Sequence, residues 1–198
     1  CIFVLILGGF LAVVGKTKAL ETGIQVLVKK LKGNELALIP ILMFIFSIAG
    51  TTYGMLEETV GFYALLAAAM VMAGMDTVVS SAIVLLGAGS GVLGSTINPF
   101  AVGAAVSALP DNVKVNQGLI IAIGAILWLT TLLISVLFVM NYAKKVIKKK
   151  GSTILSLQER RNMEMEYGAH AAKKDENVKL TSKQIVTLCL FGLTFLVM

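Results

Sequence analysis

Charged residues divide the chain into long apolar stretches. Six stretches contain no Asp, Glu, Lys or Arg: residues 1–15, 36–56, 59–75, 77–110, 115–143 and 184–198. A membrane-spanning α-helix needs about 20 apolar residues to cross a hydrocarbon core of roughly 30 Å. The pattern therefore predicts an all-α membrane protein that crosses the bilayer several times.

Composition supports this fold class. Of the 198 residues, 57% are hydrophobic and 14% are charged, and the mean hydropathy is +0.89. A soluble domain has about 25% charged and about 45–50% apolar residues. The composition excludes an ordinary soluble globular domain.

The positive charge is concentrated in one segment. Residues 143–183 contain 11 of the 17 Lys and Arg residues but only 5 of the 11 Asp and Glu residues. Lysine-rich loops stay on the cytoplasmic side of a membrane, so we expect a basic cytoplasmic loop here. Tyr167 is the only aromatic residue of this segment, which argues against nucleic acid as a partner.

Residues 16–34 have an amphipathic pattern. Leu20, Ile24, Leu27 and Leu31 recur at helical spacing among lysines. This pattern is typical of a helix that lies in the membrane surface. We expect an interfacial helix on the cytoplasmic side.

The two ends of the sequence predict a longer protein. Residues 1–15 are apolar from the start, without Met and without the basic beginning of a signal peptide. Residues 184–198 are apolar but short for a full crossing. We expect an interior piece of a longer chain, in which 184–198 starts the next membrane helix.

Residues 36–75 contain two short apolar arms. The arms Ile39–Ala49 and Phe62–Met75 would measure about 17 and 21 Å as helices, less than the roughly 30 Å of a hydrocarbon core. This favours a re-entrant hairpin, whose tip stops within the membrane. Two full spans remain the alternative.

The next stretch, 77–110, is too long for one span. Its 34 residues would extend about 51 Å as a continuous helix. Pro99 removes a backbone donor in the middle and disfavours helical backbone at Asn98. We expect a broken membrane helix, followed by one ordinary span at 117–142.

Glycines before this break indicate close helix packing. Gly87 and Gly91 form a GxxxG pair, which lets two helix backbones approach each other. Residues 89–94 also match GxGxxG, but the βαβ unit of a dinucleotide site is missing. We interpret the glycines as a packing surface.

The hairpin tip and the break supply the candidate binding residues. Polar groups at membrane depth are costly and therefore indicate function, and irregular backbone there lines a cavity or protein. The candidates are Thr51, Thr52, Glu57, Glu58 and Thr59 at the tip, and Gly94, Ser95, Thr96, Asn98 and Pro99 at the break. The alternatives are an exposed loop for the carboxylates and a packed proline kink for the break.

The sequence gives no sign of an enzyme or a cofactor site. His170 is the single histidine and lies in the polar segment, where a solvated side chain is expected. Cys1 and Cys189 lie in separate apolar stretches with no metal-ligand spacing. No set of residues supports nucleophilic catalysis or a metal cluster.

Two segments resemble a known family. The run GKTKALETGIQVLVKKLKGNELALIPILMFIFSIAGTTYGMLEETVGFYALL, residues 15–66, and the run GSTINPF, residues 94–100, are similar to the N-terminal half of YfcC-type carriers. These belong with arginine/ornithine antiporters and anaerobic four-carbon-dicarboxylate carriers in the ion transporter superfamily.

The resemblance implies a protein of two inverted repeats, each with a re-entrant hairpin and a broken helix, of which this chain holds one. By position the hairpin tip is Gly50 to Thr59 and the unwound segment is Gly94 to Asn98. Ser95, Thr96 and Asn98 approximate the Ser-Asn-Thr signature of the superfamily, so a Na⁺ site is expected near them.

The expected function is secondary active transport of a small charged metabolite across a bacterial cytoplasmic membrane. Glu57 and Glu58 favour a cationic substrate, Na⁺ or H⁺, which favours an amino acid or peptide over a dicarboxylate. A four-carbon dicarboxylate carrier, a channel and a membrane scaffold are the alternatives. The expected partners are the lipid bilayer, the missing C-terminal half and, as an open alternative, a second copy of the chain.

Overall fold

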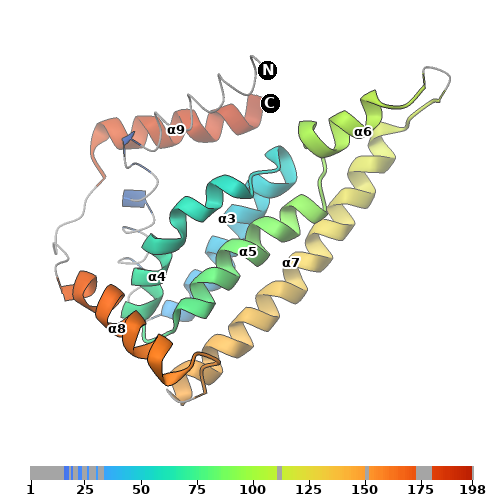
Figure 1. Ribbon diagram of the computed structural model, residues 1–198. Coiled ribbons are helices and arrows are strands. Elements are labelled where there is room, and N and C mark those ends of the chain that lie inside the picture. Colours follow the sequence, from blue (N-terminus) through green and yellow to red (C-terminus); the bar gives the residue numbers. More distant parts are fainter. Residues whose placement is uncertain are drawn as a thin grey trace. The chain divides into compact units, whose positions relative to one another are not determined.

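The computed structural model describes residues 16, 17, 19, 22, 23, 26, 30, 34–110, 113–149, 152–172 and 180–197. All regular elements within these residues are helices (Figure 1). The expected all-α class is therefore confirmed. The chain divides into two compact units, Cys1–Gly33 with Lys174–Met198, and Asn34–Lys173.

The first unit contains α9, Ser182–Val197. Its Gln184 side chain donates hydrogen bonds to the Thr17 carbonyl oxygen at 3.3 Å and to the Thr22 hydroxyl at 3.1 Å. The interfacial helix expected at 16–34 lies largely outside the described residues. Its position in a membrane surface stays a prediction.

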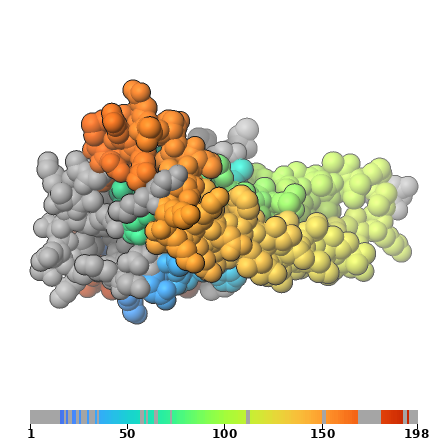
Figure 2. Space-filling view, turned by 90° about the horizontal axis from the view of Figure 1, so that it is seen from below, coloured from blue at the N-terminus to red at the C-terminus, as the bar shows by residue number. Residues whose placement is uncertain are grey.

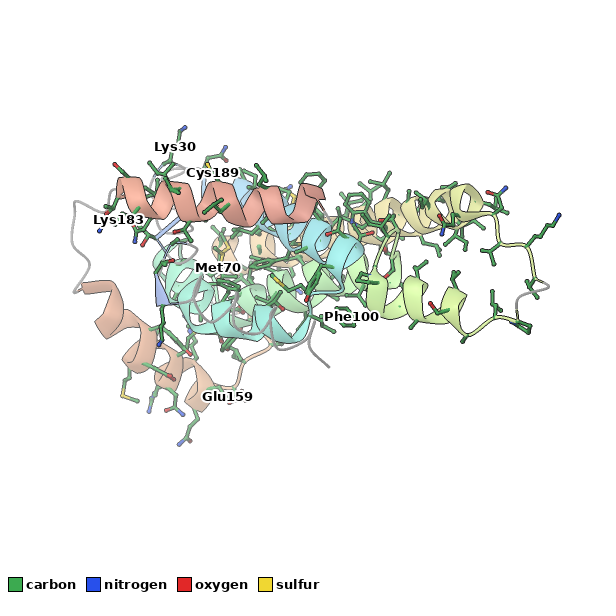
Figure 3. The ribbon with its side chains drawn as sticks, turned by 90° about the horizontal axis from the view of Figure 1, so that it is seen from above. Lys30, Met70, Phe100, Glu159, Lys183 and Cys189 are labelled. Atoms are coloured by element: carbon green, nitrogen blue, oxygen red, sulfur yellow. The ribbon has the colours of Figure 1, made fainter. Side chains whose placement is uncertain are left out.

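The second unit holds the hairpin, the break and the long helix. Its elements, in chain order, are η1 (Glu35–Ala37), α3 (Leu38–Tyr53), η2 (Glu57–Phe62), α4 (Tyr63–Met72), α5 (Thr77–Leu93), the π-helical turn η3 (Pro99–Gly103), α6 (Ala104–Ser107), α7 (Gln117–Lys148) and α8 (Leu157–Ala172). Helix α5 packs against α3, α4 and α7, and is the centre of this unit (Figure 1). Met70 of α4 is fully buried in the core (Figure 3).

Helices α3 and α5 pack in parallel through glycines. A Cβ atom at Gly91 would lie 2.1 Å from the Ser47 carbonyl oxygen, and one at Gly87 would lie 3.1 Å from Met43 Cα. Residue numbers increase together along the contact, so both helices run the same way. The prediction that Gly87 and Gly91 serve close helix packing is confirmed.

Helices α3 and α4, which correspond to the two arms of the predicted hairpin, are joined by residues 54–62. They contain 16 and 10 residues, or about 24 and 15 Å of helix. Phe46 of α3 contacts Phe62 at the end of the connection, with ring centroids 5.7 Å apart. Both arms are too short to cross a roughly 30 Å core squarely, so a re-entrant hairpin remains our prediction.

Helix α7 is the one candidate membrane span among the described residues. It has 32 residues, about 48 Å, and most side chains in its apolar part are exposed. It continues six residues beyond the span expected at 117–142. The extension is lysine-rich, which explains why the apolar pattern ended earlier.

The segment 143–183, which we predicted to be a basic cytoplasmic loop, contains the end of α7 and all of α8. Its cytoplasmic position stays a prediction. Helix α8 packs along α4 and buries Met163. Ser156 and Glu159 cap its start reciprocally: the Ser156 backbone N–H and hydroxyl donate to the Glu159 carboxylate at 2.8 and 2.7 Å. This S-x-x-E capping box is a sequence signal for a helix start that the hydropathy pattern does not contain.

Candidate functional site

Helices α3 and α5 end side by side. Helix α3 stops at Gly54, whose φ of 79° is left-handed, and α5 stops at Gly94. Since the two helices are parallel, both of their C-terminal ends lie in the same region. Each end has a partial negative charge of about half an elementary charge, so together they favour a cation.

A pair of threonines joins the two helix ends. The Thr51 hydroxyl donates to the Gly94 carbonyl oxygen at 2.7 Å, and lies 3.3 Å from the Thr96 hydroxyl. In return, the Thr96 backbone N–H and hydroxyl donate to the Thr51 carbonyl oxygen at 3.1 and 3.3 Å. The structure therefore brings the hairpin candidates and the break candidates together at Thr51 and Thr96.

Asn98 starts the helical segment after the break. Its side-chain oxygen accepts from the backbone N–H groups of Phe100 and Ala101 at 2.9 and 3.2 Å. Its amide nitrogen donates to the Ser95 hydroxyl at 3.0 Å, and Ser95 in turn donates to the Val92 carbonyl oxygen. Both oxygen lone pairs of this buried residue are used in the present conformation, so Asn98 shapes the break.

Pro99 follows as the first residue of η3, where proline is tolerated because its missing N–H needs no partner. Its side chain is exposed. The predicted break of the stretch 77–110 is thus present, with residues 94–98 outside any helix. Both Pro99 and the N-cap formed by Asn98 contribute to this break.

Helix α7 closes the other side of the break through a glycine. A Cβ atom at Gly124 would lie 2.5 Å from the Ser95 carbonyl oxygen, and one at Gly94 would lie 2.2 Å from the Trp128 backbone nitrogen. Trp128 also stacks on Phe44, with ring centroids 6.2 Å apart. Gly124 is not among the predicted site residues, although an isolated glycine within an apolar helix is a signal for such a close contact.

Two other candidates of the hairpin tip, Thr52 and Thr59, form hydrogen bonds within their own segments and not with the break. The Thr52 hydroxyl donates to the Ile48 carbonyl oxygen of its own helix, and the buried Thr59 hydroxyl donates to that of Leu56. Glu57 and Glu58 begin η2, but their side chains lie outside the described residues. Their expected role at the site therefore stays a prediction.

A cavity of about 330 Å³ lies beside Thr96. It is lined by the break, by η3 and α6, and by the start of α7, including Thr96, Ile97, Val102, Ser107, Gln117 and Ile120. Its walls combine apolar side chains with two hydroxyls and one amide. A small polar molecule in this cavity would reach the Thr96 end of the threonine pair.

Asp76 forms a second buried polar cluster at the opposite end of α5. One carboxylate oxygen accepts from the Val79 backbone N–H at 3.1 Å and caps α5. The other accepts from the Tyr142 hydroxyl at 2.6 Å and from the Thr153 hydroxyl. This cluster is not among the predicted sites, although an Asp directly before an apolar helix is a typical N-cap.

Comparison with known proteins gives the family. A family model described as "C4-dicarboxylate anaerobic carrier" (DcuC) matches residues 1–198. The chain belongs to this family. The match also includes the segment 151–180, which the two quoted runs do not cover.

Curated relatives support this membership. The chain is 34% identical over 146 residues to a protein of Escherichia coli (strain K12) named "Putative basic amino acid antiporter YfcC". It is also 29% identical over all its 198 residues to an "Uncharacterized protein" of Haemophilus influenzae (strain ATCC 51907 / DSM 11121 / KW20 / Rd). The alignments cover 74% and 100% of this chain but 28% and 38% of the two relatives. No solved structure matches the chain.

The expected resemblance to YfcC-type and four-carbon-dicarboxylate carriers is confirmed. The description of the family names a carrier, and the name of the Escherichia coli relative is that of a putative antiporter. The family description mentions a dicarboxylate and the name of the first relative mentions basic amino acids. The two do not agree on a substrate class.

Proposed function

We propose that the protein is a secondary active transporter that moves a small charged metabolite by alternating access. The observation that carries this proposal is the meeting of α3 and α5 at the Thr51–Thr96 pair. Helices that end within the membrane next to irregular backbone are the parts from which secondary transporters build binding sites. The hairpin and the broken helix would form one of two inverted repeats.

The geometry favours a coupling cation. Two helix C-termini and the hydroxyls of Thr51 and Thr96 meet at the break, and carbonyl and hydroxyl oxygens can replace the hydration shell of Na⁺. Ser95 and Asn98 support the shape of this region through their own hydrogen bonds. We propose Na⁺ as the coupling ion, with H⁺ through the Glu57–Glu58 pair as the second candidate.

For the substrate we propose a basic amino acid or a small peptide. Adjacent carboxylates attract a guanidinium or ammonium group and repel a dicarboxylate unless they are protonated. The printed name of the Escherichia coli relative supports this choice. A four-carbon dicarboxylate is the second candidate, because the description of the family supports it.

The membrane would be the bacterial cytoplasmic membrane, with residues 143–183 in the cytoplasm. The exposed lysines at the end of α7 support this orientation through the positive-inside rule. Residues 111–116 would then face outward. A homodimer remains a proposal that only a measurement of oligomeric state can test.

Uptake by proteoliposomes tests the function. The full-length protein is reconstituted, and exchange of labelled arginine is compared with exchange of labelled succinate, each with and without a Na⁺ gradient. We expect the wild-type protein to exchange arginine, and we expect the double variant Glu57→Gln with Glu58→Gln to exchange it more slowly. Succinate exchange alone would replace the proposed substrate by the second candidate, and uncoupled ionic current would support a channel.

A scaffold gives another outcome. If the wild-type protein transports neither compound, or if polar substitutions at the hairpin tip and at the break leave transport unchanged, the transporter proposal is wrong. Lys114→Gln is the control for loss of a charge, because this lysine is exposed and is not among the predicted site residues. Its transport should equal that of the wild type.

A further inference from the structure

Four lysines lie on one side of the end of α7. Lys144, Lys145, Lys148 and Lys149 are all exposed. At about 100° per residue, Lys144, Lys145 and Lys148 fall within a sector of roughly 100° around the helix axis, and Lys149 follows directly as the C-cap residue of α7. We call these four residues the lysine patch. The opposite side of the same turns packs inward, since Ala143 and Val146 are buried.

Towards the N-terminus of α7, the side of the helix that carries the lysine patch is apolar. Leu133, Ile134, Leu137 and Phe138 lie within about 20° of the same angular range, about two to three turns before the patch. Each of these side chains is more than half exposed. We call them the apolar stripe, and Figure 2 shows α7 lying at the surface along its length. One continuous exposed face therefore changes from apolar to basic.

The length of α7 places the lysine patch at the depth of lipid headgroups. The helix is uncharged and mainly apolar from Leu119 to Met140, which corresponds to about 33 Å and matches a hydrocarbon core of roughly 30 Å. Lys144 and Lys149 then lie about 6 and 13 Å beyond the end of this segment. Headgroup phosphates occupy that layer.

We propose that the lysine patch and the apolar stripe together bind anionic phospholipids selectively. The acyl chains would lie on the apolar stripe and the phosphate groups would contact the lysines. A surface lysine next to an anionic leaflet raises affinity by about fivefold, and salt screens this attraction. The inference rests on membership in a membrane carrier family, not on the proposed substrate.

Quenching of a single tryptophan by brominated lipids tests the proposal. Trp128 is the only tryptophan of these 198 residues, so Trp128→Phe combined with Phe138→Trp, in a protein whose tryptophans elsewhere are replaced by Phe, moves the reporter to the apolar stripe. The protein is reconstituted in mixed bilayers of phosphatidylcholine and phosphatidylglycerol. In one measurement the phosphatidylcholine is brominated, and in the other the phosphatidylglycerol is brominated. We expect the relative binding constant to favour phosphatidylglycerol by about fivefold or more at low ionic strength, and 1 M NaCl to bring it close to one.

A triple variant and a matched control decide the role of the lysines. Lys144→Gln with Lys145→Gln and Lys148→Gln should remove the preference. Lys114→Gln with Arg161→Gln and Lys183→Gln removes the same charge from other exposed positions and should keep it. Equal quenching by both lipids in the parent, or an unchanged preference in the first variant, would overturn the proposal. So would a reporter that neither lipid quenches, because protein would then cover the stripe.

Discussion

The Asn98 amide occupies the space that a side chain at Gly54 would need. A Cβ atom at Gly54 would lie 2.6 Å from the Asn98 amide nitrogen and 3.0 Å from its oxygen. Gly54 ends the first hairpin arm and Asn98 starts the helical segment after the break. The geometry of the hairpin tip and that of the break are therefore fixed by each other.

Gly54→Ala should destabilise the protein for two reasons. The φ of 79° disfavours any residue with a Cβ, at a cost of about 1–2 kcal/mol, and the contact with Asn98 adds a steric cost. Gly74→Ala is a matched control, because Gly74 has a φ of 78° but nothing within 4 Å of the added atom. Thermal unfolding in detergent should show a clearly larger loss for Gly54→Ala. Equal losses of stability in the two variants would mean that the Asn98 side chain can move away from the added methyl group at no measurable cost.

Thr51→Val should weaken coupling between the two helix ends. The change preserves shape but removes the donor to the Gly94 carbonyl oxygen, which costs about 1–3 kcal/mol when the acceptor stays buried. If the coupling cation binds here, the Na⁺ concentration for half-maximal transport should rise about 5- to 150-fold. Thr51→Ser keeps the hydroxyl and should restore most of the affinity.

The control for this prediction is Thr130→Val on α7. The Thr130 hydroxyl donates only to carbonyl oxygens of its own helix and is exposed. Its transport and its Na⁺ dependence should be unchanged. If Thr51→Val folds normally and its transport keeps the wild-type Na⁺ dependence, the proposed cation site at Thr51 is wrong.

Much of the architecture could be predicted because its causes are local in the sequence. Hydrophobic runs indicated the helices, Pro99 indicated the break, and the Gly87–Gly91 pair indicated a close helix contact. The parallel contact that brings Thr51 beside Thr96 could not be predicted, because the two residues are 45 positions apart. Pairing of distant helices depends on packing of whole surfaces, which no local pattern specifies.

Polar contacts were harder to predict than helices. Asp76 looked like a boundary between apolar stretches, since its partners Tyr142 and Thr153 lie 66 and 77 positions away. Helix α8 looked like a loop because its sequence is polar and it packs through few buried side chains. In both cases the sequence contained a helix-capping signal, which the hydrophobic pattern alone does not show.

Asp76→Asn should destabilise the second unit and uncouple three segments. The neutral amide keeps one acceptor oxygen but cannot accept from the Val79 backbone and both hydroxyls as the carboxylate does. We expect a loss of about 1–3 kcal/mol in the free energy of unfolding. A double-mutant cycle with Tyr142→Phe should give a coupling energy of about 0.5–3 kcal/mol. Strict additivity would contradict a direct contact.

The start of α8 should depend on acid pH. Hydrogen bonds from the Ser156 hydroxyl and then from its backbone N–H lower the pKa of Glu159 below the ordinary value of 4.5. The cap is therefore fully formed above that value and is lost as the pH falls through the lowered pKa of the folded state. Relative to the intrinsic exchange rate at each pH, hydrogen exchange of the first-turn amides of α8 should accelerate as the pH falls below the ordinary value.

Glu159→Gln is the test variant for this cap, and Glu166→Gln is its control. Glutamine at position 159 can still accept from Ser156 but cannot titrate, so the acid-dependent acceleration should disappear. Glu166 is exposed and lies on the same helix, so its variant should keep the wild-type profile. An identical pH profile in the wild type and Glu159→Gln would contradict the capping role.

The orientation of the second unit can be tested with single cysteines. We expect residues 143–183 to face the cytoplasm, because the exposed lysines at the end of α7 and the lysines that follow would resist translocation. Ser152→Cys and Asn112→Cys lie beyond opposite ends of α7, in a background where Cys1 and Cys189 are replaced by Ser. An impermeant maleimide should label position 112 in intact cells and position 152 only after the membrane is opened. Labelling of position 152 in intact cells would reverse the orientation. It would also place the lysine patch in the outer leaflet, where the positive-inside rule does not act.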